Sequence, residues 1–537
     1  MTLRLASLGL LMLACASSGG PAPAASAAPA RPRRPALVVM ITVDQLLPGY
    51  LDRWPGQLTG GLARLAGEGA VFTNAFQDHA VTETAPGHAT VLSGRWPRHT
   101  GIIDNGRGVG DTAAPLLEVG GPGASPRRFQ GTALFDWLAA ADSAARALSV
   151  SRKDRGAILP VGRARADVYW YQAGTFTTSR YYRDTLPAWV RAFNARRVPF
   201  AAADREWTPL VADSAYVEPD SATWENGGRD VTFPHRLPAD SARAAALFAG
   251  TPWIDSLTLA LALEGAAALR LGQRGVTDLL AVSLSATDAI GHTFGPDSRE
   301  VHDQILRLDR YLGWFLARLE ALVGPGEMVV VLTADHGVTP FPAAARARGV
   351  EAYDVALDTL FTAVNRELDA AYRSQHDPEN WLVLDGGMVF LRDNGRLSAA
   401  GIALDSVWRA LAARVRRVPG VARVDRPADL AAADTTADPV TRRWVHHLAP
   451  DLPVPLVITL HEHSAWARVY ADHGKPSDAD AHVPLVLWGP GIRRGRYDGR
   501  AATVDIAPTL ARLLAIAPDS TVDGRVLGEA LAPERGR

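Results

Sequence analysis

The chain has 537 residues, of which 47% are hydrophobic and 21% are charged, and its formal net charge is −1. This composition excludes an intrinsically disordered protein, and the balanced charge gives no support to nucleic-acid binding. The length allows one large domain with insertions, or about two to three ordinary domains.

Residues 1–16 have the features of a secretion signal. Arg4 precedes an uncharged apolar run that ends at Ala14, which is too short to span a membrane as a helix. Cleavage before Cys15 would give a lipoprotein with an acylated cysteine, and we favour it because Cys15 is the only cysteine. Cleavage after Ala16 would instead release a soluble protein. The protein is therefore predicted to be exported, either periplasmic or lipid-anchored at the bacterial envelope through Cys15.

Residues 17–35, rich in Pro, Ala and Ser, are expected to form a flexible linker to a catalytic domain at 36–537. Continuous apolar runs predict buried strands at 36–44, 278–288, 327–335 and 482–491. Continuous rather than alternating apolarity is typical of a parallel sheet covered on both faces. Helical spacing of apolar residues predicts helices at 255–272 and 298–324.

These patterns predict an α/β fold, a three-layer sandwich with a largely parallel central sheet. Residues 166–250 and 350–455 lack strong strand runs. We expect them to be insertions that form cap segments over the active site.

Three of the predicted strands end on an aspartate, and two of these aspartates have a histidine close behind them. A single aspartate at a strand end usually forms a turn or caps a helix. In an open α/β sheet, however, ligands bind beyond the carboxyl ends of the strands. Carboxylate and imidazole groups are the usual zinc ligands where cysteine is absent. The six candidate ligands are Asp44, Asp288, His292, Asp335, His336 and His482.

Six ligands suit two metal ions better than one. Two ions about 4 Å apart can clamp both sides of an in-line displacement at phosphorus. The sequence therefore predicts a two-metal site at the edge of the sheet.

The motifs ITVDQ, TETAPGHATVLSG, GIIDN, ATDAIGHTFGP, TADHG and DAHVPLVLWGPGI lie in this order within residues 36–528. Together they resemble the alkaline phosphatase superfamily. They are most similar to the branch with a threonine nucleophile, which contains type I phosphodiesterases, nucleotide pyrophosphatases and the phosphate-irrepressible alkaline phosphatases. The resemblance implies two Zn²⁺ ions per chain. It gives one zinc the ligands Asp288, His292 and His482, and the other the ligands Asp44, Asp335, His336 and the oxygen of Thr84.

Thr84 in TAPGH occupies the position of the family's nucleophile. A bound cation favours the ionised form of an alcohol and so makes it a good nucleophile. We expect Thr82 and Thr90 to be strand or capping hydroxyls, and His88 to orient the turn rather than bind metal. The sulfatase branch needs Cys or Ser followed by x-P-x-R, so a formylglycine sulfatase is excluded.

Three further residues are assigned to the substrate phosphate by the resemblance. Asn105 in HTGIIDNG matches an asparagine that hydrogen-bonds a phosphoryl oxygen, although Asn-Gly is also a common turn. Lys153 and Arg155 in SRKDRG match a K-x-R pair that binds the dianionic phosphoryl group in the monoesterases. Two cations favour a dianion over the single charge of a diester. Because Lys153 is one of only two lysines among 56 basic residues, its presence indicates that an ammonium group is required there.

Some motifs leave alternatives open. The stretch GTFTTSRYY at 174–182 is similar to a segment near the monoesterase entrance, and it is equally consistent with an edge strand. His461 and His463 have metal-like spacing but are expected to lie on the surface. His473 in DHGKP is the alternative to His482 as a zinc ligand. We favour His482 because it directly precedes a strand-like run.

The sequence therefore predicts an exported zinc alkaline phosphatase that hydrolyses small phosphate monoesters through a phospho-threonine. It has no predicted nucleic-acid partner, and a monomer is favoured. The alternative is a phosphodiesterase or nucleotide pyrophosphatase with the same bimetal site, a branch that lacks the Lys-Arg pair. A non-catalytic metal- or phosphate-binding lipoprotein would need a broken site, whereas every predicted ligand is present.

Overall fold

The computed structural model describes residues 34–372, 380–392, 395–449, 452–467, 471–519 and 521–533. The predicted signal peptide, both cleavage sites and residues 17–33 of the predicted linker lie outside the described residues.

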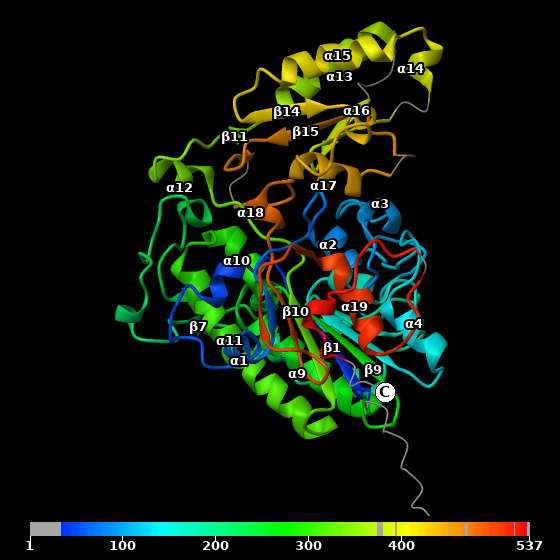
Figure 1. The fold of residues 1–537 in the computed structure, drawn as a ribbon. Coiled ribbons are helices and arrows are strands. Elements are labelled where there is room, and N and C mark those ends of the chain that lie inside the picture. The colour runs from blue at the N-terminus through cyan, green and yellow to red at the C-terminus, as the bar shows by residue number, and fades with distance from the viewer. Residues whose placement is uncertain are drawn as a thin grey trace, which may run out of the picture. The chain divides into compact units, whose positions relative to one another are not determined.

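A nine-stranded sheet forms the centre of the fold, in the order β18-β2-β17-β10-β1-β9-β4-β5-β6 (Figure 1). Only β17 and β6 run against the direction of the other strands. The predicted α/β fold with a largely parallel central sheet is therefore confirmed. The strands are β1 (Leu37–Val43), β2 (Ala70–Phe72), β4 (Ala147–Ser151), β5 (Asp167–Gln172), β6 (Thr175–Thr177), β9 (Asp278–Leu284), β10 (Met328–Thr333), β17 (Leu485–Trp488) and β18 (Gly495–Tyr497).

The continuous apolar sequence of β1 is explained by burial on both faces of the sheet. Its odd-numbered residues, Leu37 to Val43, pack into one hydrophobic core, and Val38 and Met40 pack into another. Helices α1 (Gly61–Glu68), α9 (Trp253–Leu269) and α11 (Arg299–Val323) contribute to the first core. Helices α2 (Thr84–Val91), α4 (Leu134–Ala141), α5 (Asp154–Ile158) and α19 (Ile506–Leu513) contribute to the second. These layers form the predicted three-layer sandwich.

The predicted helices at 255–272 and 298–324 correspond to α9 and α11. The predicted strand at 278–288 is too long, because β9 ends at Leu284 and helix α10 (Ala286–Phe294) follows it. Asp288 therefore lies in the first turn of a helix rather than at a strand end. A carboxylate is favourable at that position because it faces the positive end of the helix dipole.

The two expected insertions differ from their predicted outlines. Residues 166–250 begin with β5 and β6, which belong to the central sheet. Residues 350–455 hold most of a second, antiparallel sheet in the order β12-β13-β15-β14. Its strands are β12 (Leu382–Asp385), β13 (Met388–Leu391), β14 (Val421–Asp425) and β15 (Leu456–Leu460), and its hydrophobic core includes α13 (Asp358–Tyr372) and α15 (Leu404–Val415) (Figure 1). The strands escaped prediction because they are short.

The remaining elements are short helices and two-residue strands. The helices are α3 (Pro97–Thr100), α6 (Ala188–Asn194), α7 (Val198–Ala201), α8 (Ser241–Leu247), α12 (Pro342–Ala347), α14 (Arg396–Ala399), α16 (Pro427–Ala431), α17 (Pro439–His447) and α18 (Asp478–Ala481). The strands are β3 (Ala75–Phe76), β7 (Glu206–Trp207), β8 (His235–Arg236), β11 (Asp354–Val355), β16 (Ala465–Trp466) and β19 (Ala501–Ala502).

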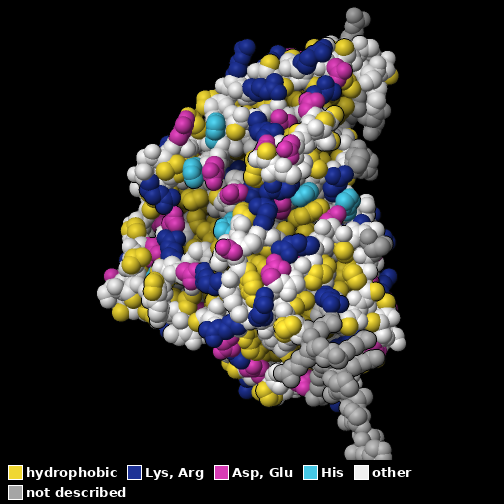
Figure 2. Space-filling model, in the orientation of Figure 1, with side chains coloured by type: hydrophobic (Ala, Val, Ile, Leu, Met, Phe, Trp, Pro, Cys, Tyr) yellow, Lys and Arg dark blue, Asp and Glu magenta, His cyan; other side chains and the backbone are white. Residues whose placement is uncertain are grey.

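Basic and acidic side chains are interspersed over the face shown in Figure 2, in keeping with the net charge near zero. Among the described residues, no single helix has both the length and the hydropathy of a membrane span. One bent pair, 241–250 with 253–269, meets these criteria by length and composition alone.

Candidate metal centre

Three neighbouring strands, β10, β1 and β9, deliver acidic side chains to the same edge of the central sheet. Asp44 follows β1 directly, and Asp335 with His336 follows β10. Asp288 and His292 lie one turn apart on α10, which follows β9. Because these strands are parallel, their carboxyl ends meet. Segments almost 300 residues apart in sequence, from 44 to 336, therefore converge at one place.

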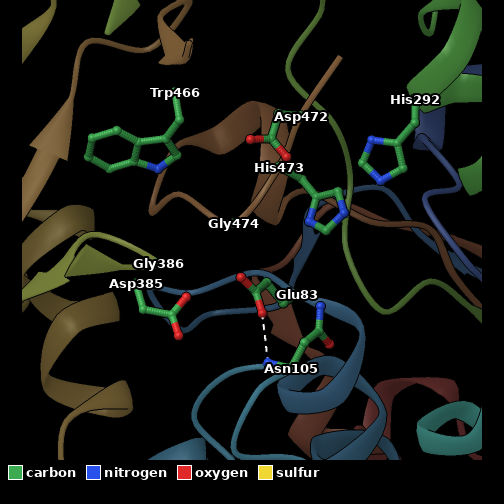
Figure 3. A pocket seen from close by; sticks show the side chains of 9 residues that line it. All are labelled: Glu83, Asn105, His292, Asp385, Gly386, Trp466, Asp472, His473 and Gly474. Carbon is green, nitrogen blue, oxygen red and sulfur yellow. Dashed lines mark hydrogen bonds between the residues drawn. The ribbon is translucent and has the colours of Figure 1, made fainter. Parts of the chain in front are cut away.

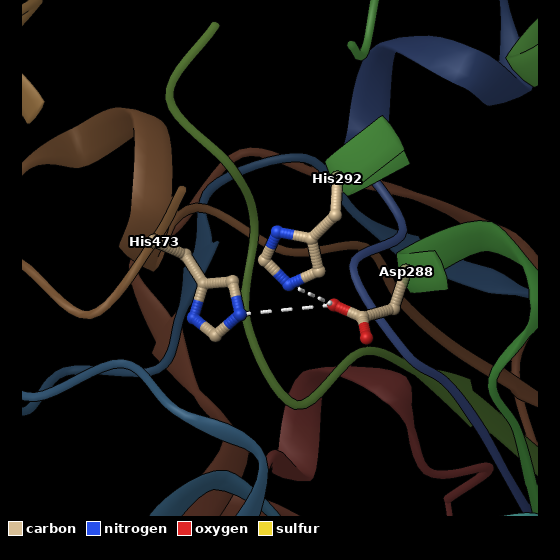
Figure 4. A group of neighbouring side chains, drawn as sticks. All are labelled: Asp288, His292 and His473. Carbon is tan, nitrogen blue, oxygen red and sulfur yellow. Dashed lines mark ion pairs between the residues drawn. The ribbon is translucent and has the colours of Figure 1, made fainter. Parts of the chain in front are cut away.

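The first group of possible metal ligands consists of Asp288, His292 and His473 (Figure 4). The Nε2 atom of His292 lies 3.1 Å from Oδ1 of Asp288, and Nε2 of His473 lies 3.7 Å from the same oxygen. Both rings thus point a nitrogen at one carboxylate. This is the arrangement that a single cation between the three side chains requires.

The second group consists of Asp44, Asp288 and His336, whose ligand atoms lie within 4.8 Å of one another. Nε2 of His336 is 3.3 Å from Oδ1 of Asp44 and 3.6 Å from Oδ2 of Asp335. Asp335 therefore extends this group. Asp288 belongs to both groups, so the two groups are adjacent.

His482, which we favoured as a ligand, does not join either group, whereas the alternative His473 belongs to the first. Its Nε2 bonds to the carbonyl of Thr73 at 3.0 Å, and its ring stacks on Phe76. A β-bridge between Phe76 and His482 fixes this orientation. His473 instead stacks on His336, with 3.6 Å between the ring centroids. The apolar run after His482 correctly predicted a strand, but it did not predict the direction of the side chain.

The imidazoles of His292, His336 and His473 share one hydrogen-bonding pattern, in which Nδ1 bonds to a backbone carbonyl. Nδ1 of His336 and of His473 each bonds to a backbone carbonyl at 2.9 Å, that of Gly337 and Thr82 respectively. Nδ1 of His292 bonds to the carbonyl of Ala471. A carbonyl that accepts the Nδ1 proton turns Nε2 toward the carboxylates, which is how ligand histidines are oriented in metal sites.

Several buried polar atoms at this centre have no hydrogen-bond partner. They are both carboxylate oxygens of Asp44, Oδ2 of Asp335 and Nε2 of His336, which make ion-pair contacts with one another and with Lys153 but no hydrogen bond. A buried polar atom without a hydrogen bond costs free energy, so a cluster of such atoms indicates a site for a bound ion. Carboxylate and imidazole donors fit zinc. The residues present therefore fit the metal ions that the sequence predicts.

Charge coupling shifts the pKa values of these groups. Burial would raise the pKa of Asp288, but the Lys153 ammonium and His292 hold it well below its ordinary value. Burial would lower the pKa of His336, but Asp335 and Asp44 raise it to about 9. Burial, together with the neighbouring His336 and His292, keeps the pKa of His473 well below its ordinary value. His473 is thus a neutral imidazole at neutral pH, the form that binds metal.

Thr84 begins helix α2 and is almost fully buried. The motif TETAPGHATV at 82–91 therefore leads into a helix and does not form a strand. The ammonium of Lys153 donates to the Thr84 hydroxyl at 3.1 Å and to Oδ2 of Asp288 at 2.7 Å. It also contacts the carboxylate of Asp44. The predicted nucleophile and the predicted phosphate-binding lysine therefore lie together at the metal centre.

The other predicted site residues have simpler surroundings. Oδ1 of Asn105 accepts a hydrogen bond from the backbone amide of Ala85 at 2.9 Å, at the start of α2. The side-chain NH₂ group of Asn105 can therefore donate to a substrate. The Arg155 side chain lies 3.5 Å from the carboxylate of Asp154. His88 is buried, and it bonds to the carbonyl of Thr84 and the hydroxyl of Ser283, each at 2.8 Å.

The hydroxyls and histidines that we placed outside the chemistry also have structural partners. Thr90 bonds to the carbonyl of Gly87 within α2, and Thr82 bonds to the carbonyl of Lys475. His461 is exposed and His463 is half-buried. The stretch 174–182 contains β6, the last strand of the central sheet.

One supporting residue was missed in the sequence. The side-chain amide of Gln45 donates to Oδ1 of Asp288 at 3.0 Å, and its backbone amide donates to Oδ1 of Asp335 at 3.3 Å. Its φ of 67° is unusual for a residue other than glycine. Gln45 directly follows Asp44 in the motif ITVDQ, but only the fold shows that it connects two further aspartates.

A cavity of about 180 Å³ opens beside the metal centre (Figure 3). It brings together the start of α2, the β12–β13 hairpin and the loop that carries His473. The lining residues are Glu83, Asn105, His292, Asp385, Gly386, Trp466, Asp472, His473 and Gly474. Glu83 accepts a hydrogen bond from the amide of Asn105 at 2.8 Å. Residues from the second sheet thus form part of the wall next to the site.

An α/β sandwich that gathers aspartates, histidines and a buried threonine at one edge of its sheet has the architecture of the alkaline phosphatase superfamily. The family model described as "Type I phosphodiesterase / nucleotide pyrophosphatase" matches residues 38–401. The chain belongs to this family, within the alkaline phosphatase superfamily.

Relatives with established names resemble the chain over nearly its whole length. Alkaline phosphatase PhoV of Synechococcus elongatus is 30% identical, covering 99% of this chain and 100% of PhoV. Alkaline phosphatase PafA of Elizabethkingia meningoseptica is also 30% identical, covering 93% of this chain and 95% of PafA. The crystal structure of wild-type PafA superimposes with a TM-score of 0.86 at 28% identity, covering 94% of this chain and 100% of that one.

Proposed function

We propose that the protein is an exported, zinc-dependent phosphate monoester hydrolase, an alkaline phosphatase, with Thr84 as its nucleophile. The observation that carries this proposal is the contact of the Thr84 hydroxyl with the Lys153 ammonium, 3.1 Å away, beside the two Asp/His groups. The names of the full-length relatives support the same reaction.

In the proposed reaction, Oγ of Thr84 attacks the phosphorus atom of a small monoester. An O–P bond to Thr84 forms, the bond to the alcohol breaks, and the alcohol leaves. Water then hydrolyses the phospho-threonine and restores the hydroxyl. Lys153 holds one phosphoryl oxygen by a charge-assisted hydrogen bond, and the NH₂ group of Asn105 donates to another. Arg155, two residues after Lys153, is proposed as the second cation of the dianion site.

Two zinc ions would be held by the residues that the fold gathers. Asp288, His292 and His473 would hold one ion, and Asp44, Asp335, His336 and Thr84 would hold the other. When bound, the ions would supply Lewis acidity that favours the ionised hydroxyl and stabilises the departing oxygen. The protein's own contribution is to fix these ligands through Gln45 and the backbone carbonyls that accept from the Nδ1 atoms.

A phosphodiesterase or nucleotide pyrophosphatase with the same centre is the second candidate. The description of the matching family model favours it. The buried ammonium of Lys153 favours the monoesterase, because an additional cation at the phosphate stabilises a dianion more than a monoanion. We also propose export with a cleaved signal, anchored through acylated Cys15, and a monomeric state.

The test compares p-nitrophenyl phosphate with bis(p-nitrophenyl) phosphate, using protein whose zinc content is measured. We expect two zinc ions per chain and a higher kcat/KM for the monoester. Thr84→Ala should lose nearly all turnover yet keep its zinc and fold, and Thr84→Ser should keep part of the activity. A faster diester reaction would favour the second candidate. An unchanged rate in Thr84→Ala would reject the covalent mechanism.

A further inference from the structure

Lys475 is the second of the two lysines in the chain, and its side chain is only 5% exposed. The other 54 basic residues are arginines. A buried lysine in such a chain indicates a position where the compact ammonium, with three donors around one point, is needed rather than the planar guanidinium. Lys475 lies two residues after His473 in the sequence, close to the metal centre.

The ammonium of Lys475 connects three separate segments. It donates to the hydroxyl of Thr339 at 2.7 Å and to the carbonyl of Ser464 at 2.7 Å. It also lies 3.9 Å from Oδ2 of Asp480. Thr339 belongs to the loop after β10, Ser464 precedes β16, and Asp480 lies on α18. The buried ammonium therefore connects the segments that surround the loop carrying His473.

Asp480 completes this network. Its Oδ2 accepts from the backbone amide of Lys475 at 3.1 Å, and its Oδ1 accepts from the hydroxyl of Thr339 at 2.6 Å. Thr339 thus accepts from the ammonium and donates to the carboxylate. A buried charge pair whose members are also hydrogen-bonded defines a single geometry, although it adds little net stability.

The network leads directly to the ring of His473. The carbonyl of Lys475 accepts from the hydroxyl of Thr82 at 3.0 Å, and the carbonyl of Thr82 accepts from Nδ1 of His473 at 2.9 Å. On the other side of His473, the amide of Thr339 donates to the carbonyl of Asp472 at 3.0 Å. The backbone is therefore held on both sides of His473, and Thr82, whose carbonyl orients its ring, is itself hydrogen-bonded to the backbone of Lys475.

We propose that Lys475 is a positioning residue, which fixes the 472–475 loop so that Nε2 of His473 faces Asp288 and His292. The proposal rests on the proposed function, because it concerns the zinc ion assigned to these three residues. This positioning role explains why position 475 holds lysine rather than arginine. A guanidinium is longer and planar, so it could not meet Thr339 and Ser464 from the same buried point without displacing the loop.

The test measures zinc affinity by competition with a chromophoric chelator, on the full mature chain. The variants are Lys475→Met, the double variant Lys475→Met/Asp480→Asn, which removes both buried charges, and Thr82→Val, which removes only the hydroxyl link. We expect one of the two zinc ions to bind at least about tenfold more weakly in the first two variants, and less so in Thr82→Val. The other ion should keep its affinity, and excess zinc should restore turnover.

Asp309→Asn is the control, because Asp309 accepts hydrogen bonds from amides at the start of α1 instead. It should lower stability without changing either zinc affinity. Wild-type affinity for both ions in the folded double variant would overturn the proposal, and if that variant does not fold, wild-type affinities in Thr82→Val would overturn it. Equal weakening of both ions would also overturn it. A wild-type chain that holds fewer than two zinc ions would instead refute the proposed function, and this proposal with it.

Discussion

The ammonium of Lys153 links the Thr84 hydroxyl to the carboxylates of Asp44 and Asp288. The ammonium is therefore placed to bind a phosphoryl oxygen, and its positive charge offsets the negative charge of the two carboxylates. Arg155 has a different setting, since its guanidinium lies near Asp154. The two residues predicted to bind phosphate therefore differ in their contacts, because Lys153 contacts Thr84 and Asp288 whereas Arg155 contacts Asp154.

Lys153→Ala should depress kcat/KM for a monoester much more than for a diester. Loss of one charge-assisted hydrogen bond costs on the order of 1.5–3 kcal/mol, which is roughly one to two factors of ten in rate. Lys153→Arg tests the requirement for an ammonium, and we expect it to be impaired because a planar group cannot meet three oxygens from this position. The measurement is kcat/KM for p-nitrophenyl phosphate and its bis-ester. Equal losses on both esters would show that the lysine acts structurally.

His473→Ala should weaken one of the two zinc sites, whereas His482→Ala should leave both intact. The reason is geometric, because Nε2 of His473 faces Asp288 and that of His482 bonds to Thr73. Zinc content after dialysis at a buffered free-zinc concentration checks this. If His482→Ala loses zinc and His473→Ala does not, His482 rather than His473 is the ligand.

The sequence was sufficient for residues whose role follows from strand ends. Asp44 and Asp335 follow buried apolar runs, and adjacent parallel strands bring them together. It was not sufficient to choose between the two candidate histidines, because the apolar run after His482 predicts a strand, whereas the neighbours of each ring are set by segments distant in the sequence. Gln45 was missed for a related reason. Its contacts reach residues 243 and 290 positions away, and no local pattern encodes them.

At the scale of elements, the long buried strands and helices were predictable because their apolar residues recur over many positions. The second sheet was not, since its strands have four or five residues and three of them are partly exposed. Its pairing is set by contacts between distant segments rather than by local sequence. The boundary between β9 and α10 was missed because an apolar run fits both a strand and a helix.

Helix α17 gives a prediction about pH. His447 at its end is fully buried, and burial lowers its pKa to about 3. The unfolded chain binds a proton near the ordinary value of 6.5, so it takes up protons between these two values while the folded chain does not. Stability is therefore complete above about pH 6.5 and falls with falling pH. The loss from this group should be about 2 kcal/mol between pH 7.5 and pH 5.

His447→Leu should flatten this part of the stability profile, because leucine does not titrate. Urea unfolding at pH 7.5 and pH 5 provides the measurement. The exposed His461→Leu is the matched control and should keep the wild-type difference between the two pH values. If the His447→Leu profile is as steep as that of the wild type, other groups determine the acid sensitivity.

At the scale of the whole molecule, the proposed ligands connect segments that the chain separates widely. They come from the ends of β1 and β10, from α2 and α10, and from the loop at 471–475. The unfolded chain does not hold these groups together, so zinc binds the folded state selectively. Such binding stabilises the fold by RT ln(1 + [Zn]/Kd), which is about 2.7 kcal/mol at a hundredfold excess over Kd.

Removing zinc with a chelator should therefore lower the thermal midpoint by several degrees, and adding zinc back should restore it. Magnesium should not restore it, because the imidazole donors of His292, His336 and His473 suit zinc and not magnesium. Calorimetry on the same sample before and after dialysis measures the shift. In His473→Ala the shift should be smaller than in the wild type, because one site no longer contributes fully. A midpoint that is the same with and without zinc would mean that the ions do not bind the folded centre at all.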